Sequence, residues 1–272
     1  MQFLDWSLWE PWYLWIASAL NLSISMDYEA AQKLDLMIKD RIDNINIIKR
    51  NMRGKLAIIV GAGPSLEKGI EIISERRLGV IIAADGACSK LLEVGIIPHM
   101  IVTDLDGNVD DIYESWRKGS YVVVHAHGDN IPALEKHVQK FSGRIIGTTQ
   151  TKPIGSLHNF GGFTDGDRAV FMALELGCKA VLMIGMDLSR KVGRYSKPWL
   201  KGDEPIWPFK RAKFDVARRL LSWASRLYSK PIARVTISGY DYGKPIDNIK
   251  DIGVEILDKW VKEVGLEDAI LS

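Results

Sequence analysis

Between residues 55 and 185, short runs of apolar, largely β-branched residues alternate with stretches of helical spacing. A strand that is apolar along its whole length must be buried on both faces, and a helix between two strands lets them run parallel. The pattern therefore predicts an α/β fold, with an open, mostly parallel sheet and helices on both faces. The expected strands are 56–60, 80–84, 100–104, 121–126, 144–148 and 180–185. The expected helices are near 66–77, 87–94, 108–117, 130–140 and 166–176.

The first 53 residues are expected to pack on this core as an aromatic segment followed by a helix. Tryptophans recur at every third residue from Trp6 to Trp15, and the apolar run around them is too short to span a bilayer. We therefore expect an aromatic cap on the core or a contact in a homodimer, and no membrane partner. Residues 26–50 carry apolar side chains at helical spacing, which predicts one helix ending before Gly54.

Residues 54–272 are expected to form a single α/β catalytic domain, because no linker divides the chain. Residues 188–210 are rich in Gly, Pro, Lys and Trp, which predicts a long loop. Its cations and rings would suit a lid that closes over phosphates and a flat ring. Beyond it, the pattern predicts a helix over 211–229, a strand over 234–238 and a helix over 251–264.

The net charge and the two cysteines limit which partners and which cellular compartment are expected. Lysine and arginine number 36 against 34 aspartates and glutamates, and this near balance argues against a nucleic-acid partner. An anionic substrate must then be held by local groups such as loops, a metal or single cations. Cys88 and Cys178 lie in apolar runs far apart in sequence, which predicts free, buried thiols in a reducing compartment. We therefore expect a cytoplasmic protein.

Acidic residues follow nearly every expected strand. In an open parallel sheet, ligands bind beyond the carboxyl ends of the strands, where such side chains would repel one another. A divalent cation removes this repulsion, and all-oxygen ligands select magnesium or manganese. Asp104 and Asp106 stand out, because aspartates two residues apart can reach one ion where a strand turns. The acidic residues after the strands are Asp85, Asp104, Asp106, Asp129, Asp165 and Asp187.

A glycine loop follows the first expected strand. Gly61 and Gly63 would let the backbone approach phosphate oxygens, and a helix starting near Ser65 would point free N–H groups at them. Position 66 is leucine, where a dinucleotide fingerprint has its third glycine, and no P-loop lysine follows. Asp85 lies about where that fingerprint places its ribose-binding acid, so these residues leave an NAD-dependent enzyme open.

Two histidines, His125 and His127, share one face of an expected strand. This arrangement suggests zinc, but no cysteine or third histidine stands nearby at ligand spacing. A hydrogen-bonding role toward a substrate or Asp129 is expected instead. The other histidines near this part of the chain, His99 and His137, are expected to be structural.

Five motifs, in this order, make the chain similar to the archaeal 6-hydroxymethyl-7,8-dihydropterin diphosphokinase family, the MptE-like proteins. The similarity runs from about residue 54 to at least residue 190, and the ordered set is more specific than any single motif. The motifs are Gly61-Ala-Gly-Pro-Ser-Leu66, Ala84-Asp-Gly-Ala87, Val102-Thr-Asp-Leu-Asp-Gly107, His125-Ala-His-Gly-Asp-Asn130 and Gly162-Phe-Thr-Asp-Gly-Asp-Arg-Ala169.

The resemblance implies transfer of diphosphate from ATP to 6-hydroxymethyl-7,8-dihydropterin with release of AMP, a step toward folate-like or methanopterin-like cofactors. Catalysis of such a transfer is mostly alignment and neutralisation of charge on phosphate oxygens. We therefore expect Mg²⁺ on Asp104 and Asp106, with Asp129 or Asp165 completing its shell or orienting the nucleophile. Arg168 is expected to hold triphosphate oxygens.

The other site residues are expected to bind the two substrates. ATP is expected to lie along the glycine loop and near an acid that faces its ribose or the metal. This nucleotide set is Gly61, Gly63, Ser65, Asp85, Gly86 and Asp167. The pterin is expected against an aromatic face with polar groups around it. This acceptor set is His125, His127, Asn130, Phe163 and Thr164.

The family in turn resembles the catalytic domain of thiamin pyrophosphokinase, whose three aspartate motifs match segments 85–86, 103–107 and 164–169 in order. Two departures favour a pterin enzyme. Arg168 replaces the lysine of the thiamin enzymes, and too few residues follow position 190 to form their β-sandwich.

Three other hypotheses are compatible with parts of the pattern. They are a metal-dependent glycosyltransferase that uses a nucleotide-sugar, an NAD-dependent oxidoreductase and a nucleotide-binding module without enzymatic activity. The Asp-x-Asp pair suits the first and the glycine loop the second. Segment 164–169 argues against both, because neither chemistry needs it.

Overall fold

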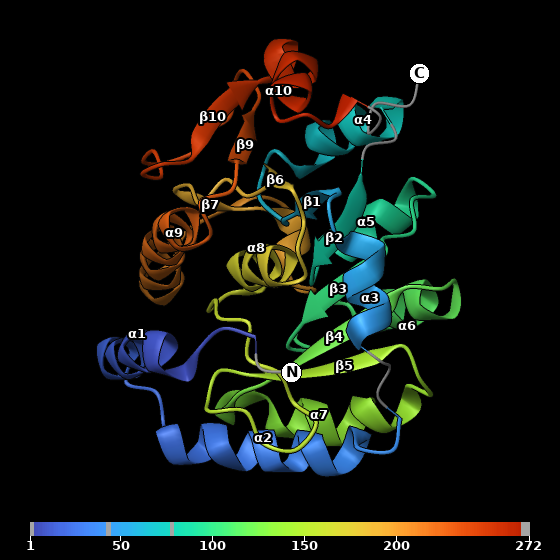
Figure 1. Ribbon diagram of the computed structural model, residues 1–272, viewed down its shortest axis with the longest axis vertical. Coiled ribbons are helices and arrows are strands. Elements are labelled where there is room, and N and C mark those ends of the chain that lie inside the picture. Colours follow the sequence, from blue (N-terminus) through green and yellow to red (C-terminus); the bar gives the residue numbers. More distant parts are fainter. Residues whose placement is uncertain (1–2, 42–44, 77–78, 268–272) are drawn as a thin grey trace.

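The computed structural model describes residues 3–41, 45–76 and 79–267, and within these ranges the chain folds around one large parallel sheet (Figure 1). The predicted α/β class is confirmed, and each of the six expected strands forms within one residue of its expected bounds. The strands in sheet order are β10 (Lys250–Gly253), β9 (Ile232–Thr236), β6 (Ala180–Ile184), β1 (Leu56–Val60), β2 (Val80–Ala84), β3 (Met100–Thr103), β4 (Tyr121–Ala126) and β5 (Ile145–Thr149).

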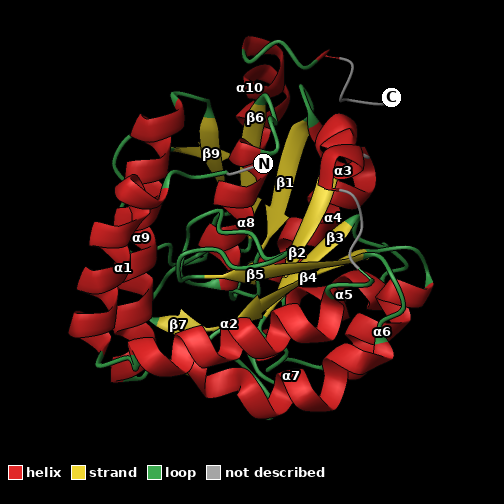
Figure 2. Cartoon of the chain, turned by 60° about the horizontal axis from the view of Figure 1, so that its bottom comes forward, coloured by secondary structure: helices red, strands yellow, loops and turns green. Residues whose placement is uncertain are grey.

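Helices cover both faces of this sheet, as the apolar strands predict (Figure 2). In β1, Leu56 and Ile58 belong to one buried cluster, and Ala57 and Ile59 belong to the other. The helices of the first cluster are α2 (Ile24–Ile38), α4 (Leu66–Arg76), α5 (Ala87–Glu93), α6 (Val109–Arg117), α7 (Ile131–His137) and α10 (Leu257–Glu263). Those of the second are α1 (Trp6–Leu20), α3 (Ile45–Met52), α8 (Asp165–Glu175) and α9 (Pro208–Tyr228).

The aromatic N-terminal segment forms α1, which packs on the core through one of its sides. Trp9, Tyr13 and Ile16 are buried, and Trp9 Nε1 donates a hydrogen bond to the carbonyl oxygen of Gln150 at 2.8 Å. This bond ties the helix to the loop after β5. No helix within the described ranges has both the length and the apolar character that crossing a bilayer requires.

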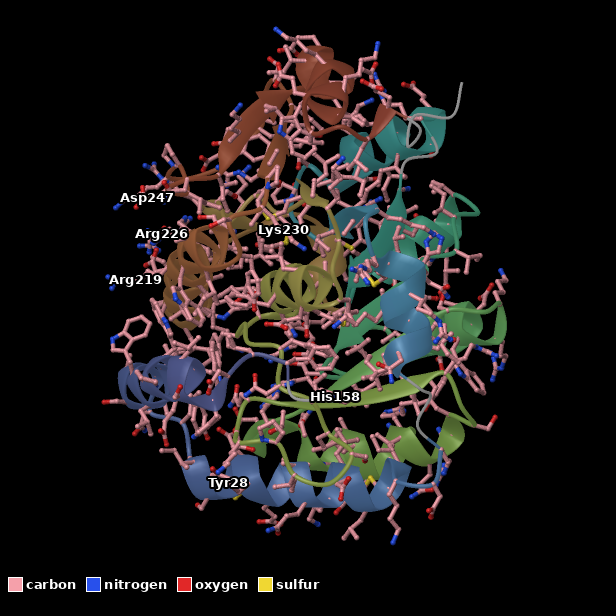
Figure 3. The ribbon with its side chains drawn as sticks, viewed as in Figure 1. Tyr28, His158, Arg219, Arg226, Lys230 and Asp247 are labelled. Atoms are coloured by element: carbon pink, nitrogen blue, oxygen red, sulfur yellow. The ribbon has the colours of Figure 1, made fainter. Side chains whose placement is uncertain are left out.

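Helix α9 is amphipathic and lies beside α1. Its buried side chains include Val216 and Leu220, whereas Arg219 and Arg226 project away from the sheet (Figure 3). The periodic apolar positions explain why the helix forms here, and Pro208 at its first turn favours a start at this point.

The prediction of one helix over residues 26–50 is wrong. The segment contains two helices, α2 and α3, and residues 42–44 between them lie outside the described residues. Helix α2 packs on one face of the sheet and α3 on the other. Apolar spacing continues in both helices, and periodicity alone therefore does not reveal the break.

The prediction of a helix over 251–264 is wrong in its first part. Residues Lys250–Gly253 form the edge strand β10, and the helix starts only at Leu257. The cause is a contact with β9, because Arg234 donates to both carboxylate oxygens of Asp251, at 2.7 and 2.8 Å. Arg234 is fully buried and its charge needs a partner. Its ion pair with Asp251 therefore stabilises residues 250–253 as a strand beside β9 and not as the first turn of a helix.

The expected loop over 188–210 contains short ordered pieces and ends where α9 starts at Pro208. We call residues 189–207 the strap. Within it, β7 (Lys191–Val192) pairs antiparallel with β8 (Glu204–Pro205). The strap packs closely on the glycine loop, since a Cβ atom at Gly193 would lie 2.4 Å from the carbonyl oxygen of Ala62.

Candidate active site

Three carboxylates meet at the carboxyl ends of β2 and β3. Asp85 follows β2, and Asp104 and Asp106 follow β3. One carboxylate oxygen from each lies within 4.8 Å of the others, and we call these residues the carboxylate cluster. The structure does not bring Asp129 into this cluster. Asp129 is exposed, and its backbone N–H donates to His127 Nδ1 at 3.3 Å.

Local backbone geometry holds the cluster together. Asp85 and Leu105 have positive φ angles of 42° and 65°, which are uncommon for residues with a side chain. Thr103 Oγ1 fixes both turns, because it donates to Asp85 Oδ1 at 2.5 Å and accepts from Leu105 N at 2.8 Å. Glycine at position 107 leaves room for the Asp85 carboxylate, since a Cβ atom there would lie 2.3 Å from Asp85 Oδ2.

The cluster carries excess negative charge. Burial, followed by the charges of Asp104 and Asp106, raises the pKa of Asp85 to about 7. Burial also acts against ionisation of Asp104, but the hydrogen bond and charge of His127 hold the pKa of that carboxyl well below its usual range. Lys197 from the strap forms an ion pair with Asp106. Close oxygen ligands of this charge fit a hard divalent cation.

The first cavity, of about 660 Å³ including its mouth, lies along the glycine loop. Gly61 and Gly63 are needed there because the loop packs against the end of β6. A Cβ atom at either would lie 2.6 to 2.7 Å from the carbonyl oxygen of Gly185. Their N–H groups donate to Ile184 O and Gly185 O, at 2.8 Å each, and so are already used within the protein.

Ser65 does not line this cavity. Its backbone N–H and its hydroxyl donate to the two carboxylate oxygens of Asp187, at 2.7 and 2.5 Å. The carboxylate of Asp187 thus accepts from the backbone N–H of Ser65 just before α4. The sequence pattern predicts a bound phosphate there. Burial raises the pKa of Asp187 to about 6. The remaining nucleotide candidate after β2, Gly86, does line the cavity.

The second cavity, of about 1210 Å³ including its mouth, is lined by rings and polar side chains. Phe163, Trp199, Trp207 and Phe209 supply the rings. Polar groups come from the loops after β3, β4 and β5 and from the start of α8. These polar residues include Asp104, His125, His127, Asp129, Gln150, Thr164 and Arg168.

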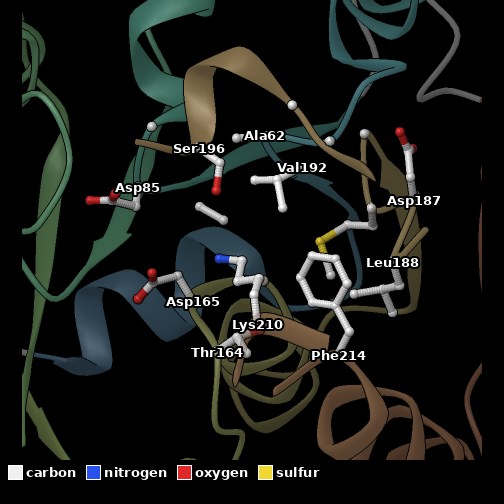
Figure 4. A pocket seen from close by; sticks show the side chains of 18 of the residues that line it. Ala62, Asp85, Thr164, Asp165, Asp187, Leu188, Val192, Ser196, Lys210 and Phe214 are labelled. Carbon is white, nitrogen blue, oxygen red and sulfur yellow. The ribbon is translucent and has the colours of Figure 1, made fainter. Parts of the chain in front are cut away.

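The two cavities share one wall. We call this wall the junction, and it consists of Asp106, Thr164, Asp165, Lys197 and Lys210. Figure 4 shows Asp165 and Lys210 on the same side of the first cavity, with Asp85 nearby. Burial, followed by the charges of Asp104 and Asp85, raises the pKa of Asp165 well above its usual value.

His125, within β4, and His127, just after it, face the second cavity in different ways. His127 Nδ1 accepts from Asp129 N, so its Nε2 carries the proton and donates to Asp104 at 3.3 Å. His125 is buried and has no hydrogen-bond partner at Nε2. Burial and then the charge of Arg168 lower the pKa of His125 well below its usual value, so this ring is neutral. Its free nitrogen is available to a ligand.

Asn130 supports these groups without lining either cavity. Its side-chain amide donates to Asp104 O at 2.9 Å and to His125 O at 2.7 Å, and its carbonyl accepts from His127 N at 3.0 Å. Each hydrogen-bonding atom of the side chain therefore has a protein partner. Asn130 fixes the loop after β3 against the loop after β4.

The residues at the start of α8 separate into two roles. Asp167 is fully buried and accepts from Phe163 N and Thr164 N, at 2.7 and 2.8 Å, so its carboxylate caps the helix. It lines neither cavity. Arg168 lines the second cavity and not the first, and its Nη2 donates to Phe163 O at 2.9 Å. Its buried Nε has no partner.

Helix α2 contributes a residue that sequence reasoning missed. Asp27 is buried and lines the second cavity. It accepts hydrogen bonds from Tyr13 Oη at 2.8 Å, Gln150 Nε2 at 2.7 Å and Gly128 N at 2.8 Å. The N-terminal helices are therefore part of the cavity wall and not only a cap on the core.

The other candidate ligands lie away from the cavities. His99 Nδ1 accepts from Ile81 N at 3.1 Å, and His137 Nδ1 lies 2.8 Å from the hydroxyl of Tyr113. Both cysteines are buried and free, as predicted. Within the described residues, no histidine or cysteine joins the carboxylate cluster, so its ligand set is one of oxygens.

Comparison with known proteins identifies the family. The model of the MptE-like family, described as 6-hydroxymethylpterin diphosphokinase MptE-like, matches residues 29–193. A Pyrococcus furiosus protein named 6-hydroxymethyl-7,8-dihydropterin pyrophosphokinase is 43% identical over 224 residues, which cover 81% of this chain and 94% of that protein. The chain belongs to the MptE-like family.

Two further comparisons place this MptE-like chain among known sequences and folds. A Methanothermobacter thermautotrophicus protein of the same name is 43% identical over 227 residues, covering 80% of this chain and 94% of that protein. The solved structure of the MAf glycosyltransferase from Magnetospirillum magneticum AMB-1 aligns with a TM-score of 0.51 at 15% identity. That match covers 88% of this chain but 42% of the glycosyltransferase, and shows a likeness of fold.

Proposed function

We propose that this MptE-like chain transfers diphosphate from ATP to 6-hydroxymethyl-7,8-dihydropterin and releases AMP. The observation that carries the proposal is the junction, where a cavity along the glycine loop and a cavity with aromatic walls share Asp106 and Asp165. Two substrates that occupy these cavities meet at the carboxylate cluster. The names of the relatives supply the acceptor and the group that is transferred.

ATP is assigned to the first cavity. The glycine loop gives it a narrow wall without side chains, and lysines of the strap and α9 supply positive charge. Asp85, Asp104 and Asp106 would hold Mg²⁺, because carboxylate oxygens are its preferred protein ligands. The bound ion would neutralise charge on the phosphate oxygens. Lys197 now pairs with Asp106, and we expect it to shift toward a phosphate when the cation binds.

The pterin is assigned to the second cavity. Its flat ring matches walls made of Phe163, Trp207 and Phe209. Its polar edge needs hydrogen-bond donors and acceptors at fixed positions. His125 Nε2 and Arg168 Nε are buried without partners and offer one acceptor and one donor. Arg168 is therefore assigned to the pterin and not to the triphosphate.

The reaction then takes place at the junction. The hydroxymethyl oxygen of the pterin attacks the β-phosphorus, and the bond from that phosphorus to the oxygen of AMP breaks. Asp165 lines both cavities, so its carboxylate is placed to accept the hydroxyl proton. His127 donates to Asp104 and holds that carboxylate in its ionised form.

Product analysis tests the proposal. Protein, ATP and Mg²⁺ are incubated with 6-hydroxymethyl-7,8-dihydropterin, and the nucleotide products are separated. We expect AMP and a pterin that carries two phosphates, in equal amounts. ADP with a singly phosphorylated acceptor would contradict the proposal. Thiamin in place of the pterin should give little product, because the aromatic walls of the second cavity match a flat fused ring. Efficient turnover of thiamin would show that the proposed acceptor is wrong.

A further inference from the structure

Lys210 lies at the junction. It belongs to none of the five motifs and lies outside residues 29–193, the segment that the family model matches. It is the third residue of α9. Its side chain is half-buried and lines both cavities. In Figure 4 its ammonium group points into the first cavity, on the side where Asp165 lies.

The charge of Lys210 has no local partner. Within the described residues, no ion pair or hydrogen bond is formed by its ammonium group, and its nearest defined contact is the ring of Phe214 at 5.5 Å. Lys197, the other lysine of the junction, is paired with Asp106. An ammonium group that is partly withdrawn from water without an ion-pair partner is unfavourable, and a bound anion offsets this cost.

Three backbone donors at the glycine loop are already used within the protein. Gly61 N and Gly63 N donate to carbonyl oxygens at the end of β6, and Ser65 N donates to Asp187. These three groups do not contact a phosphate chain in the first cavity, which leaves a larger share of its charge to a metal ion and to side-chain cations. Of the two lysines at the junction, Lys210 is the one for which no ion pair is formed within the described part of the chain.

The position of Lys210 on α9 adds to this effect. It lies in the first turn of a 21-residue helix, where the partial positive charge of the helix dipole also favours an anion. Burial, followed by the charges of Lys197 and Lys213, lowers its pKa. The charges of Asp165 and Asp106 act in the opposite direction, so the ammonium group lies between the cations and the carboxylates of the junction.

We propose that Lys210 is a catalytic residue that contacts the oxygens of the β-phosphoryl group and stabilises negative charge there during transfer. This inference rests on the proposed function. As the bond from the pterin oxygen to the β-phosphorus forms, the bond to the bridging oxygen breaks and its electron pair stays on AMP. The hydroxyl proton passes to Asp165, and Lys210 keeps its proton throughout.

The test compares Lys210→Met with Lys210→Arg and with Arg211→Met. Arg211 is exposed on the same helix, so its substitution removes a cation without touching the site. We expect kcat for Lys210→Met to fall about a hundredfold or more, as for loss of a transition-state donor. Lys210→Arg should recover part of this loss, and Arg211→Met should be unchanged. The KM for the pterin should change little, because the contact is made to phosphate.

Binding of inorganic pyrophosphate with Mg²⁺, measured by calorimetry, gives a readout that does not depend on turnover. We expect weaker binding by Lys210→Met, by about tenfold for one lost charge-assisted contact. Unchanged kcat and unchanged pyrophosphate binding in a folded Lys210→Met protein would overturn the role of Lys210. Lys210→Gln serves as the second variant if the methionine protein unfolds. Absence of AMP formation by the wild-type protein would instead overturn the proposed function.

Discussion

The two cavities that meet at the junction are built in different ways. The first is shaped by backbone, with tight turns at Gly61 and Gly63 that pack directly against the end of β6. The second is shaped by side chains from α2, the loops after β4 and β5, the start of α8 and the strap. Adding one methyl group to a glycine of the loop should therefore disrupt the first cavity. The second cavity should tolerate substitutions that keep a flat apolar wall.

The carboxylate cluster belongs to both cavities, and its loss should have the largest effect. Asp106→Ala is expected to lower kcat about a thousandfold or more, because a metal ligand next to the transferred group is removed. The folded state should remain, since Asp106 is exposed and contributes little to packing. Steady-state kinetics and a thermal melt measure the two effects.

Two further aspartates sharpen this result. Asp129→Ala should lower the rate far less than Asp106→Ala, because Asp129 lies outside the cluster. Asp110→Ala, an exposed position on α6, is the control for loss of a surface charge. An equal loss for Asp106 and Asp129 would contradict the placement of the metal.

The first cavity can be broken by a single carbon atom. In Gly63→Ala, the new Cβ atom would lie 2.6 Å from Gly185 O and 2.7 Å from Asp187 Oδ2. We expect a loss of about 1–3 kcal/mol in the free energy of unfolding, typical of overpacking, together with a large loss of ATP affinity. Gly202→Ala is the matched control, because nothing lies within 4 Å of its added carbon. Equal stability of the two variants, measured by urea unfolding, would show that the loop relaxes freely.

The contrast between the cavities also explains what could be predicted from the sequence. Asp85, Asp104 and Asp106 could be placed together because each follows an apolar run, and parallel strands end at one edge of the sheet. Asp27 and Lys210 could not be placed there. Their positions depend on how α2 and α9 pack against a sheet that is formed by distant residues.

The same limit applies to the fold. Runs such as residues 56–60 are apolar throughout, so local sequence determines them as buried strands. Strand β10 depends on an ion pair between Arg234 and Asp251, 17 residues apart, and helical spacing around Trp260 hides it. Helices α2 and α3 are separate because they pack on opposite faces of the sheet. Contacts between residues that are distant in sequence cannot be read from the spacing of apolar residues.

The second cavity should respond more weakly to substitution. Trp207→Leu keeps an apolar wall but removes an aromatic face, so we expect the KM for the pterin to rise by about tenfold at most and the KM for ATP to stay the same. Trp15→Leu is the control, because Trp15 lies on α1 and lines neither cavity. An increase in the KM for ATP would show that the two substrates were assigned to the wrong cavities.

The strap should give the smallest effect on stability. Arg194 Nη2 donates to Glu67 Oε1 at 2.8 Å, and both side chains are close to half exposed. We expect Arg194→Ala to cost less than about 1 kcal/mol of unfolding free energy, as for exposed ion pairs. Cleavage of the strap by a protease should become faster in this variant. If bound ATP analogue, Mg²⁺ and pterin do not slow that cleavage, the strap does not act as a lid.

The central claim is attack on the β-phosphorus at the junction, and ATP labelled at its γ-phosphate tests it most directly. The transferred group then contains both the β- and the γ-phosphate. We predict that all of the label consumed appears in a pterin product with two phosphates, with one AMP formed for each labelled product. Label in a pterin product with one phosphate, accompanied by ADP, would contradict the account even if the metal site and both cavities were correct.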